Sequence, residues 1–449
     1  MSDTTAPLTH ADVAEPARPG SGARQLLAIV AAGALCVPGI ALKLSGAHPA
    51  TLVAAFVYGF AIVGAAFLLA WAGEVVQLDV SQGLALALIA LIAVLPEYAV
   101  DFVFAWKAGK NPAEYAPLAL ANMTGSNRLL IGVGWSMVVF LAAWRMHRIA
   151  RRKKYTGPLD TDIALERSHA IEIAFLAAAT LYSLSLPFKH TLTLIDAGIL
   201  VLLYGLYVAR LAKAPAEEPD FVGPPQLLAR LAPLRRRLVV AALLLYAAGA
   251  IVLCAERFAE SLVQTGESFG VSTFLLVQWV APLASEAPEL LVAGLFAWRL
   301  NTNAGLGTLI SSKVNQWTLL VGTLPIVFAI SSGALHGLPL DALQREELFL
   351  TAAQSAFAVA VLSNRKFSVR EGAMLLGLFL SQFAIGAVVP ESWRAAERYG
   401  VGVVYLVLAA IVIISKYKAV GRVLNDGFRV PVRELVHDDE APAFTGERP

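Results

Sequence analysis

Long apolar stretches, separated by short polar segments, make up most of this chain. Twelve of them reach the length of at least 17 residues that suggests a membrane-spanning helix. They lie near 24–43, 49–72, 82–106, 116–144, 169–186, 191–211, 237–255, 271–298, 303–331, 347–363, 370–389 and 399–417. The pattern predicts an all-α polytopic membrane protein with about 12 transmembrane helices.

Four of these stretches are long and contain Gly, Pro or polar residues in the middle: 82–106, 116–144, 271–298 and 303–331. Interruptions of this kind are typical of bent or broken helices, which are tolerated in a membrane where they line a cavity. We therefore expect these four stretches to surround a polar site.

Composition agrees with a membrane protein. Of the 449 residues, 57% are hydrophobic and only 15% are charged, whereas a soluble domain has roughly 25% charged residues. The expected surroundings are a lipid bilayer, and a net charge of +2 gives no reason to expect nucleic acid as a partner. The only two cysteines, Cys36 and Cys254, lie in apolar stretches and are interpreted as packing residues, which excludes a disulfide framework.

One short motif occurs twice at a constant offset of 192 residues. The segments LPEYAVDFVFAW (95–106) and APELLVAGLFAW (287–298) share six of eleven positions, counted from each proline. The shared residues are Pro96, Glu97, Val100, Phe104, Ala105 and Trp106, matched by Pro288, Glu289, Val292, Phe296, Ala297 and Trp298. Duplication of a polar, interrupted membrane helix is typical of a secondary transporter.

Lys and Arg are concentrated in the loops after even-numbered helices, with Lys107 and Lys110 as the main exception. By the positive-inside rule, both termini and the loops 145–168 and 212–236 should be cytoplasmic. Helices two to six and seven to eleven then form two five-helix repeats of inverted topology, with one extra helix at each end.

The expected organisation follows from these boundaries. It comprises a disordered tail (1–23), an extra helix (24–43), the first repeat (49–211), a cytoplasmic linker (212–236), the second repeat (237–389), an extra helix (399–417) and a C-terminal tail (425–449). The stretch 24–43 could instead be a signal peptide, but its length and the lack of preceding basic residues favour a retained helix.

The repeated motif places carboxylates near the membrane midplane. Counting 1.5 Å per residue along 82–106 and 271–298 puts Glu97, Ser285, Glu286 and Glu289 near the centre. The helices that follow carry neutral oxygens at a similar depth: Asn122, Ser126 and Asn127 on one, and Thr308, Ser311, Ser312, Asn315 and Gln316 on the other. Carboxylates with hydroxyl and amide oxygens are the ligands that hard cations prefer, so we expect a cation site here.

The paired PE motifs, each followed by a Gly/Ser/Asn segment (121–128 and 307–316), resemble the two alpha repeats of the calcium/cation antiporter superfamily, which includes the sodium/calcium exchangers. The resemblance implies that Glu97 and Glu289 bind the metal cation, together with Ser126, Ser285 and Ser312. Asn122 and Asn127 also match the second motif of the family. No cofactor is implied beyond the transported cations, Na⁺ and Ca²⁺ or H⁺.

The chain departs from this pattern in several places. Ala93 and Val94 occupy the two hydroxyl positions before Glu97, and Leu130 occupies a polar position whose counterpart is Gln316. Glu286 replaces a hydroxyl, and Lys313 replaces the asparagine of the second repeat.

Charged residues near the expected centre leave several alternatives open. We expect Lys313 to pair with Glu286 or Glu289, or else to hold the helices together. Asp101 is either a ligand or a partner of Arg128. Four acidic groups (Glu97, Asp101, Glu286, Glu289) and two basic groups (Arg128, Lys313) would give a formal charge of −2, which suits one divalent or two monovalent cations.

The predicted function is secondary active cation antiport of the sodium/calcium exchanger type, by alternating access, in a bacterial-type inner membrane. The alternative is a sodium/proton or other cation/proton exchanger, because the first repeat has lost hydroxyls and a lysine is present. The sequence contains no HExxH, nucleophile or phosphate-loop motif, so an enzyme is not expected. The inverted repeats favour a transporter over a channel.

Overall fold

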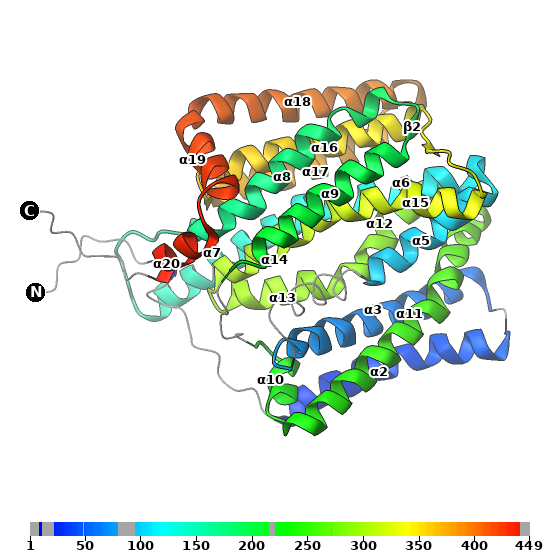
Figure 1. The fold of residues 1–449 in the computed structure, drawn as a ribbon, viewed down its shortest axis with the longest axis horizontal. Helices are drawn as coiled ribbons and strands as arrows, with labels where there is room; N and C mark the ends of the chain where they lie inside the picture. The colour runs from blue at the N-terminus through cyan, green and yellow to red at the C-terminus, as the bar shows by residue number, and fades with distance from the viewer. Residues whose placement is uncertain are drawn as a thin grey trace, which may run out of the picture.

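The structure is a computed structural model that describes residues 9–10, 22–47, 49–79, 95–214, 221–270 and 272–440. Most of these residues form helices that run roughly parallel to one another in a single bundle (Figure 1). The all-α polytopic fold expected from the hydrophobic pattern is confirmed.

The first half of the bundle comes before a short linker. It contains α2 (Gly22–Ser45), α3 (Thr51–Val76), α5 (Leu95–Lys110), α6 (Pro112–Leu129), the π-helix η1 (Leu130–Trp135), α7 (Ser136–Arg152), the 3₁₀ turn η2 (Arg167–His169), α8 (Ala170–Ser183), the 3₁₀ turn η3 (Leu186–Phe188) and α9 (Leu194–Leu211).

The second half begins with α10 (Pro224–Ala229) and α11 (Pro233–Phe269). It continues with α12 (Thr273–Ser285), α13 (Ala287–Trp298), α14 (Thr302–Asn315), the π-helix η4 (Gln316–Leu320), α15 (Val321–Ser332), α16 (Ala342–Leu362) and α17 (Val369–Val388). The 3₁₀ turn η5 (Glu391–Trp393), α18 (Arg394–Ser415), α19 (Tyr417–Phe428) and α20 (Val432–Glu440) follow.

Two antiparallel strand pairs mark the opposite ends of the bundle. β1 (Ile163–Ala164) pairs with β4 (Lys366–Phe367), and β2 (Thr191–Leu192) pairs with β3 (Leu338–Pro339). Each pair joins a loop of the first half to a loop of the second half. We call the two ends the β1–β4 face and the β2–β3 face. The first described residue of α2 and the helices α19 and α20 lie toward the β1–β4 face (Figure 1).

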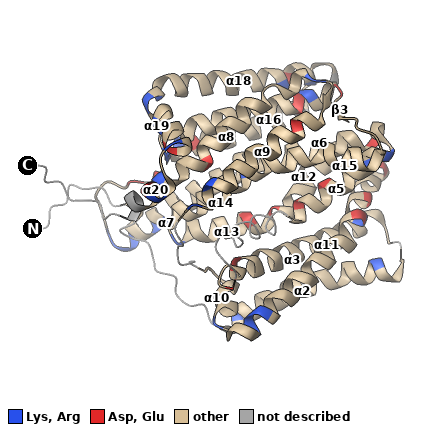
Figure 2. Ribbon diagram, viewed as in Figure 1, with Lys and Arg blue, Asp and Glu red and all other residues tan. Residues whose placement is uncertain are grey.

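Within the described residues, eight helical stretches are long and apolar enough to cross a membrane, or nine if the bent pair α12–α13 counts as one span. Most of the expected stretch 82–106 lies outside the described residues, and only its end forms α5. Lys and Arg gather mainly toward the two ends of the bundle, while acidic segments also occur in its interior near α5 and α13 (Figure 2).

The expected stretch 237–255 is longer in the structure than its apolar run. α11 spans Pro233–Phe269, because polar residues such as Glu260 extend the helix toward the β2–β3 face, where Lys107 pairs with Glu260 at 2.7 Å. Hydrophobicity alone does not predict such polar extensions, because the charged turns at the end of a helix lie outside the hydrocarbon core of the bilayer.

The two copies of the repeated motif run in opposite directions from the interior. At the end of α5, Ser331 of α15 donates its hydroxyl to the backbone oxygen of Trp106 at 2.6 Å. At the end of α13, Trp298 lies against Trp144 of α7 with ring centroids 5.1 Å apart. Because α15 ends toward the β2–β3 face and α7 toward the β1–β4 face (Figure 1), α5 and α13 lead from the centre to opposite sides.

Candidate functional site

One helix begins in the interior at the repeated motif: Glu289 lies in the first turn of α13, after Pro288. The other motif glutamate, Glu97, follows Pro96 where the described part of α5 begins. Proline fits the first turn of a helix because its missing N–H would have had no partner there. The N-terminal end carries partial positive charge, which favours a carboxylate at this position.

Glu286 occupies the break between two helices. α12 and α13 meet at an angle of 54° on either side of this residue. The break frees backbone groups in the middle of the bundle, which is tolerated where the chain lines a polar site. Ser285 and Glu286 are 3% and 2% exposed, so the break is deep in the protein.

Each helix that carries the second motif changes from an α- to a π-helix at the matched position. η1 begins at Leu130, four residues after Ser126, and η4 begins at Gln316, four residues after Ser312. Short π-helical segments inside α-helices occur frequently at functional sites. The sequence comparison of the repeats had aligned Leu130 with Gln316, but gave no sign that the helix geometry changes there.

The hydroxyls near the centre donate to backbone oxygens of their own helices. Ser126 donates to Asn122 O at 2.9 Å, and Ser285 donates to Ala281 O at 3.3 Å. Because the hydroxyl proton is used in this way, the lone pairs of each oxygen remain available to a cation.

Side chains from both repeats meet around Glu97. Ser126, Glu286 and Gln316 are neighbours of its carboxyl group. Gln316 in turn donates its amide to Glu286. The structure therefore brings together one glutamate from each repeat with the polar residue of η4.

Several buried oxygens at this centre have no hydrogen-bond partner. They are Glu97 Oε1, Glu286 Oε2, Glu289 Oε2 and Gln316 Oε1. Buried polar atoms without a partner are costly, so a group of them that are all oxygens indicates a missing positive ligand. Calcium and other hard cations prefer oxygen ligands of this kind.

Two of the predicted ligands, Ser312 and Glu289, are half-buried, whereas Glu97 and Ser126 are buried. In the described part of the chain, no three Asp, Glu, His or Cys side chains are grouped closely enough to hold a metal by themselves. Neutral oxygens would therefore have to complete any coordination shell.

Lys313 does not pair with Glu286 or Glu289, so that expectation is wrong. Its ammonium group donates to Asn127 Oδ1 at 2.6 Å and to Asn127 O at 3.3 Å, and it lies 4.4 Å from the centre of the Trp317 ring. Asn127 is the counterpart of Lys313 in the first repeat. The fully buried lysine thus links the two second-motif helices, and neutral oxygens rather than a carboxylate hold its charge.

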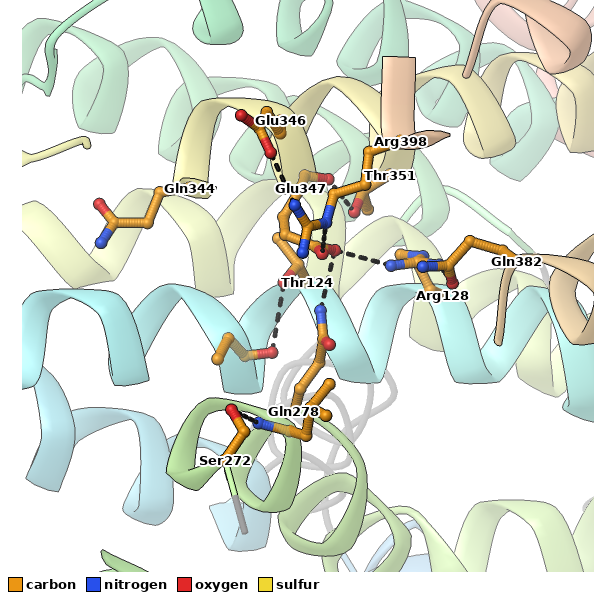
Figure 3. A network of polar contacts seen from close by, with 12 residues as sticks. Thr124, Arg128, Ser272, Gln278, Gln344, Glu346, Glu347, Thr351, Gln382 and Arg398 are labelled. Carbon is orange, nitrogen blue, oxygen red and sulfur yellow. Dashed lines mark hydrogen bonds and ion pairs between the residues drawn. The ribbon is translucent and has the colours of Figure 1, made fainter. Parts of the chain in front are cut away.

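Arg128 is not a partner of Asp101. It donates to Glu347 at 2.7 Å and to Gln382, and its guanidinium lies 5.3 Å from the Trp279 ring (Figure 3). Asp101 instead accepts a hydrogen bond from Asn122 at 2.9 Å. Removing Arg128 from the charge count of the centre leaves four carboxyl groups and one ammonium, a formal charge of −3 when all are ionised.

Glu347 is the centre of a buried network that the sequence analysis missed. Besides Arg128, it accepts hydrogen bonds from Gln278 of α12 at 2.9 Å and from Arg398 of α18 at 2.9 Å, and Arg398 also reaches Glu346 at 2.7 Å (Figure 3). In the sequence, this network is indicated by two adjacent glutamates, Glu346 and Glu347, at the start of an apolar stretch. Their partners are far away in the sequence and could not be inferred.

A second missed group is a chain of hydroxyls beside the centre. Tyr98 donates to Asn315 Oδ1 at 2.9 Å, and Asn315 donates to the Tyr204 hydroxyl at 3.2 Å. These contacts join the first turn of α5 to the end of α14 and to α9. Tyr98 is next to Glu97, so they fix the orientation of that turn.

Comparison with known proteins gives matches that cover most of the chain. The profile of the sodium/calcium exchanger protein family matches residues 50–213 and 239–385. Among curated proteins, no sequence matches significantly.

Two solved structures illustrate the similarity. One, described as the crystal structure of the H⁺/Ca²⁺ exchanger CAX, is 40% identical over 93% of this chain and 100% of its own, with a TM-score of 0.82. The other, native YfkE, is 17% identical over 83% of this chain and 99% of its own, with a TM-score of 0.56, and shows the shared fold alone.

Proposed function

Because this chain belongs to the sodium/calcium exchanger family, we propose that it is a secondary active antiporter that exchanges Ca²⁺, or a related divalent cation, for protons. The cations would bind at the centre formed by Glu97, Glu286, Glu289 and Gln316. The observation that carries the proposal is the group of buried, unpaired oxygens that both repeats contribute there.

Two features favour protons over sodium as the counter-ion. The structure that is 40% identical to this chain is described as an H⁺/Ca²⁺ exchanger. The first repeat also lacks the hydroxyls that the family pattern places before Glu97, since Ala93 and Val94 stand there. A sodium ion needs several neutral oxygens to replace its water, whereas a proton needs only one carboxylate oxygen. Exchange of calcium for sodium, which was the function predicted from the sequence, is therefore our second candidate.

The proposed mechanism is alternating access around a fixed centre. α5 and α13 lead from this centre to opposite faces, so a cation at Glu97 and Glu289 can be exposed to either side in turn. The fully buried Lys313 ammonium keeps part of the negative charge compensated when the divalent cation leaves. No resident cofactor is part of this proposal, because the cations are the transported substrates.

The cellular placement is also a proposal. The β1–β4 face carries the Lys/Arg-rich loops around 145–168 and 212–236, and the positive-inside rule favours the cytoplasm for such loops. The bacterial plasma membrane, with both termini inside, is the setting we propose.

The test is cation flux in proteoliposomes that contain the purified full chain. Uptake of radioactive calcium is measured with an imposed pH gradient, with an imposed sodium gradient and with neither. We expect uptake to follow the pH gradient. Uptake driven by sodium alone would favour the second candidate, and absence of calcium uptake under all three conditions would contradict both.

A further inference from the structure

Asp101 is a buried carboxyl group on the side of the centre that leads to the β2–β3 face. It lies one helical turn after Glu97 on α5 and is fully buried. Its Oδ1 accepts the amide of Asn122 at 2.9 Å, while its Oδ2 has no partner. A charged group without compensation inside a membrane protein is expensive and is commonly part of an ion or proton pathway.

The groups packed around Asp101 supply no positive charge. From α6 it meets the neutral Asn122, which is also fully buried, and α15 carries no titratable side chain. On α11, Arg257 and Glu260 bond to each other at 3.1 Å.

On α5 itself, Glu97 and Tyr98 add no cation, and Lys107 is held by Glu260 at 2.7 Å. α3 has no charged residue except Glu74 near its end, and the part of α12 that faces α6 presents the neutral Gln278. Within the described residues, Asp101 therefore has no ion-pair partner.

A second buried atom without a partner belongs to the residue already bonded to Asp101. Asn122 Oδ1 accepts no hydrogen bond. A protonated carboxyl group has one O–H donor, and an amide oxygen is an acceptor. One proton on Asp101 Oδ2, donated to Asn122 Oδ1, would satisfy both unpaired atoms at once, in addition to the existing amide hydrogen bond.

A metal ion fits this place less well. Calcium takes six to eight oxygen ligands, whereas only Asp101 Oδ2 and Asn122 Oδ1 are unpaired here. The formal charge of −3 at the centre is also neutralised completely by one divalent cation and one proton.

Comparison of the two repeats shows that the pair formed by Asp101 and Asn122 occurs only in the first repeat. At the offset of 192 residues, the counterpart of Asp101 is Ala293. In the second motif, where Ser126 matches Ser312 at an offset of 186 residues, the counterpart of Asn122 is Thr308. Because α5 leads to the β2–β3 face and α13 to the β1–β4 face, the extra carboxyl group lies only toward the β2–β3 face.

We propose that Asp101 and Asn122 form a proton-binding site between the central cation site and the β2–β3 face, through which the counter-ion proton enters or leaves. The proton forms an O–H bond to Asp101 Oδ2 when it is taken up, and that bond breaks when the proton passes on to water or to Glu97. The site rests on the proposed exchange of a divalent cation for protons.

The main test compares Asp101→Asn with the unchanged chain in proteoliposomes. Two fluxes are measured: calcium uptake driven by a pH gradient, and exchange of radioactive for unlabelled calcium without a gradient. We expect gradient-driven uptake to fall at least about tenfold, the equivalent of 1.4 kcal/mol, while calcium self-exchange stays within about twofold. Asp101→Glu should restore part of the gradient-driven uptake, because it returns a proton-binding carboxyl group.

Glu260→Gln is the matched control, because it removes a carboxylate further along toward the same face that already has cationic partners. We expect both of its fluxes to be unchanged. Unchanged gradient-driven uptake in Asp101→Asn would overturn the proposal. Loss of self-exchange in folded Asp101→Asn would also overturn it, because Asp101 would then belong to the divalent cation site.

A spectroscopic measurement keeps the proposal testable when a variant transports poorly. Infrared difference spectra of the purified full chain, recorded as the pH is raised, should show the carbonyl band of a protonated carboxylic acid disappearing. This signal should be missing in Asp101→Asn and shifted in Asn122→Ala, which keeps the carboxyl group but removes its amide partner.

Identical spectra in all three proteins would rule out a proton on Asp101. If the unchanged chain transports calcium only with sodium, the proposed counter-ion is wrong. The infrared signal alone then shows whether Asp101 binds a proton. Failure of the proposed counter-ion can therefore be distinguished from failure of the proposed proton-binding site.

Discussion

At the residue scale, the candidate site is defined by oxygens that lack donors. Glu97 lies in α5, Glu286 lies between α12 and α13, and Gln316 lies in η4, and each has a buried oxygen without a partner. In the proposed function, a cation supplies the positive charge that these oxygens lack. The site should therefore depend on charge at these positions more than on side-chain shape.

Replacing either motif glutamate by glutamine tests that dependence. Glu97→Gln and Glu289→Gln keep the side-chain size but remove one negative charge each from the centre. We expect calcium exchange to fall by at least about a hundredfold, because the number of charged ligands tunes calcium affinity over several decades. Calcium flux in proteoliposomes measures the effect, with size-exclusion profiles as the check for folding. Normal rates in both variants would place the ion site elsewhere.

Lys313 allows the opposite experiment. Its ammonium group is fully buried near Glu97 and Glu286, yet it bonds to the neutral oxygens of Asn127. Lys313→Asn removes a positive charge from the site, so divalent cations should bind at least about tenfold more tightly, given the strength of charge interactions in a partly shielded interior.

Calorimetric titration with calcium measures this change in affinity. Lys107→Asn is the control, since that lysine lies near the end of α5 and is paired with Glu260. Equal or weaker binding by the Lys313 variant would mean that Lys313 only holds the two repeats together.

At the scale of the elements, α6 and α12 cross in close contact. A Cβ atom on Gly125 would lie 1.8 Å from the backbone oxygen of Gln278, which no side chain could tolerate. Gly125 precedes Ser126, and Gln278 lies two turns before the break at Glu286. The close approach of these two backbones is therefore what brings the motifs of the two repeats together.

Gly125→Ala should force this crossing apart. We expect a loss of stability of about 1–3 kcal/mol or more, as for other overpacked interiors, together with loss of calcium exchange. Thermal unfolding in detergent measures the first effect. Gly249→Ala is the matched control, because a Cβ on Gly249 in α11 would meet nothing within 4 Å. Equal melting temperatures for the two variants would contradict the role given to the crossing.

At the scale of the whole molecule, the polar network around Glu347 ties the last long helix to the exchanger repeats. α18 lies beyond residues 50–213 and 239–385, which match the family profile, yet its Arg398 reaches Glu346 and Glu347 in α16. Through Arg128 and Gln278, the same carboxylate contacts α6 and α12 (Figure 3).

Glu347→Gln should be strongly destabilising. It leaves the buried guanidinium group of Arg128 and the half-buried one of Arg398 without full compensation, and breaking a buried ion pair in this way costs about 3–5 kcal/mol. Glu346→Gln, which removes only one contact to Arg398, should cost clearly less. Melting temperatures in detergent compare the two. The reverse order would show that Glu347 is not the centre of the network.

The orientation of the molecule in the membrane gives the last prediction. The loop 145–168 and the described parts of the loop 212–236 (212–214 and 221–236) lie toward the β1–β4 face (Figure 1), which we propose to be cytoplasmic. A cysteine placed at Lys153, in a chain with Cys36 and Cys254 replaced, should be labelled by an impermeant reagent only after the cells are opened. Labelling in intact cells would contradict the orientation derived from the Lys/Arg distribution.

The sequence by itself determined the features that follow from hydrophobicity and local repetition. Apolar length indicated the polytopic helical fold, and the motif Pro288–Glu289 indicated the interrupted helix at α12–α13. The interruption expected before Glu97 lies outside the described residues. Both indications depend on residues close together in the chain. The free energy of transfer into lipid and the conformation forced by proline act locally, so they can be read from local sequence.

Only the tertiary structure decided which charged groups meet. Lys313 bonds to Asn127 and Arg128 to Glu347, across 186 and 219 positions of the chain, and neither pairing follows from sequence spacing. The reason is physical. A buried charge takes whichever partner the packing of several helices places within about 3 Å. That packing is set by contacts such as the one between Gly125 and Gln278, and nothing in the stretch around Gly125 identifies Gln278 as its partner.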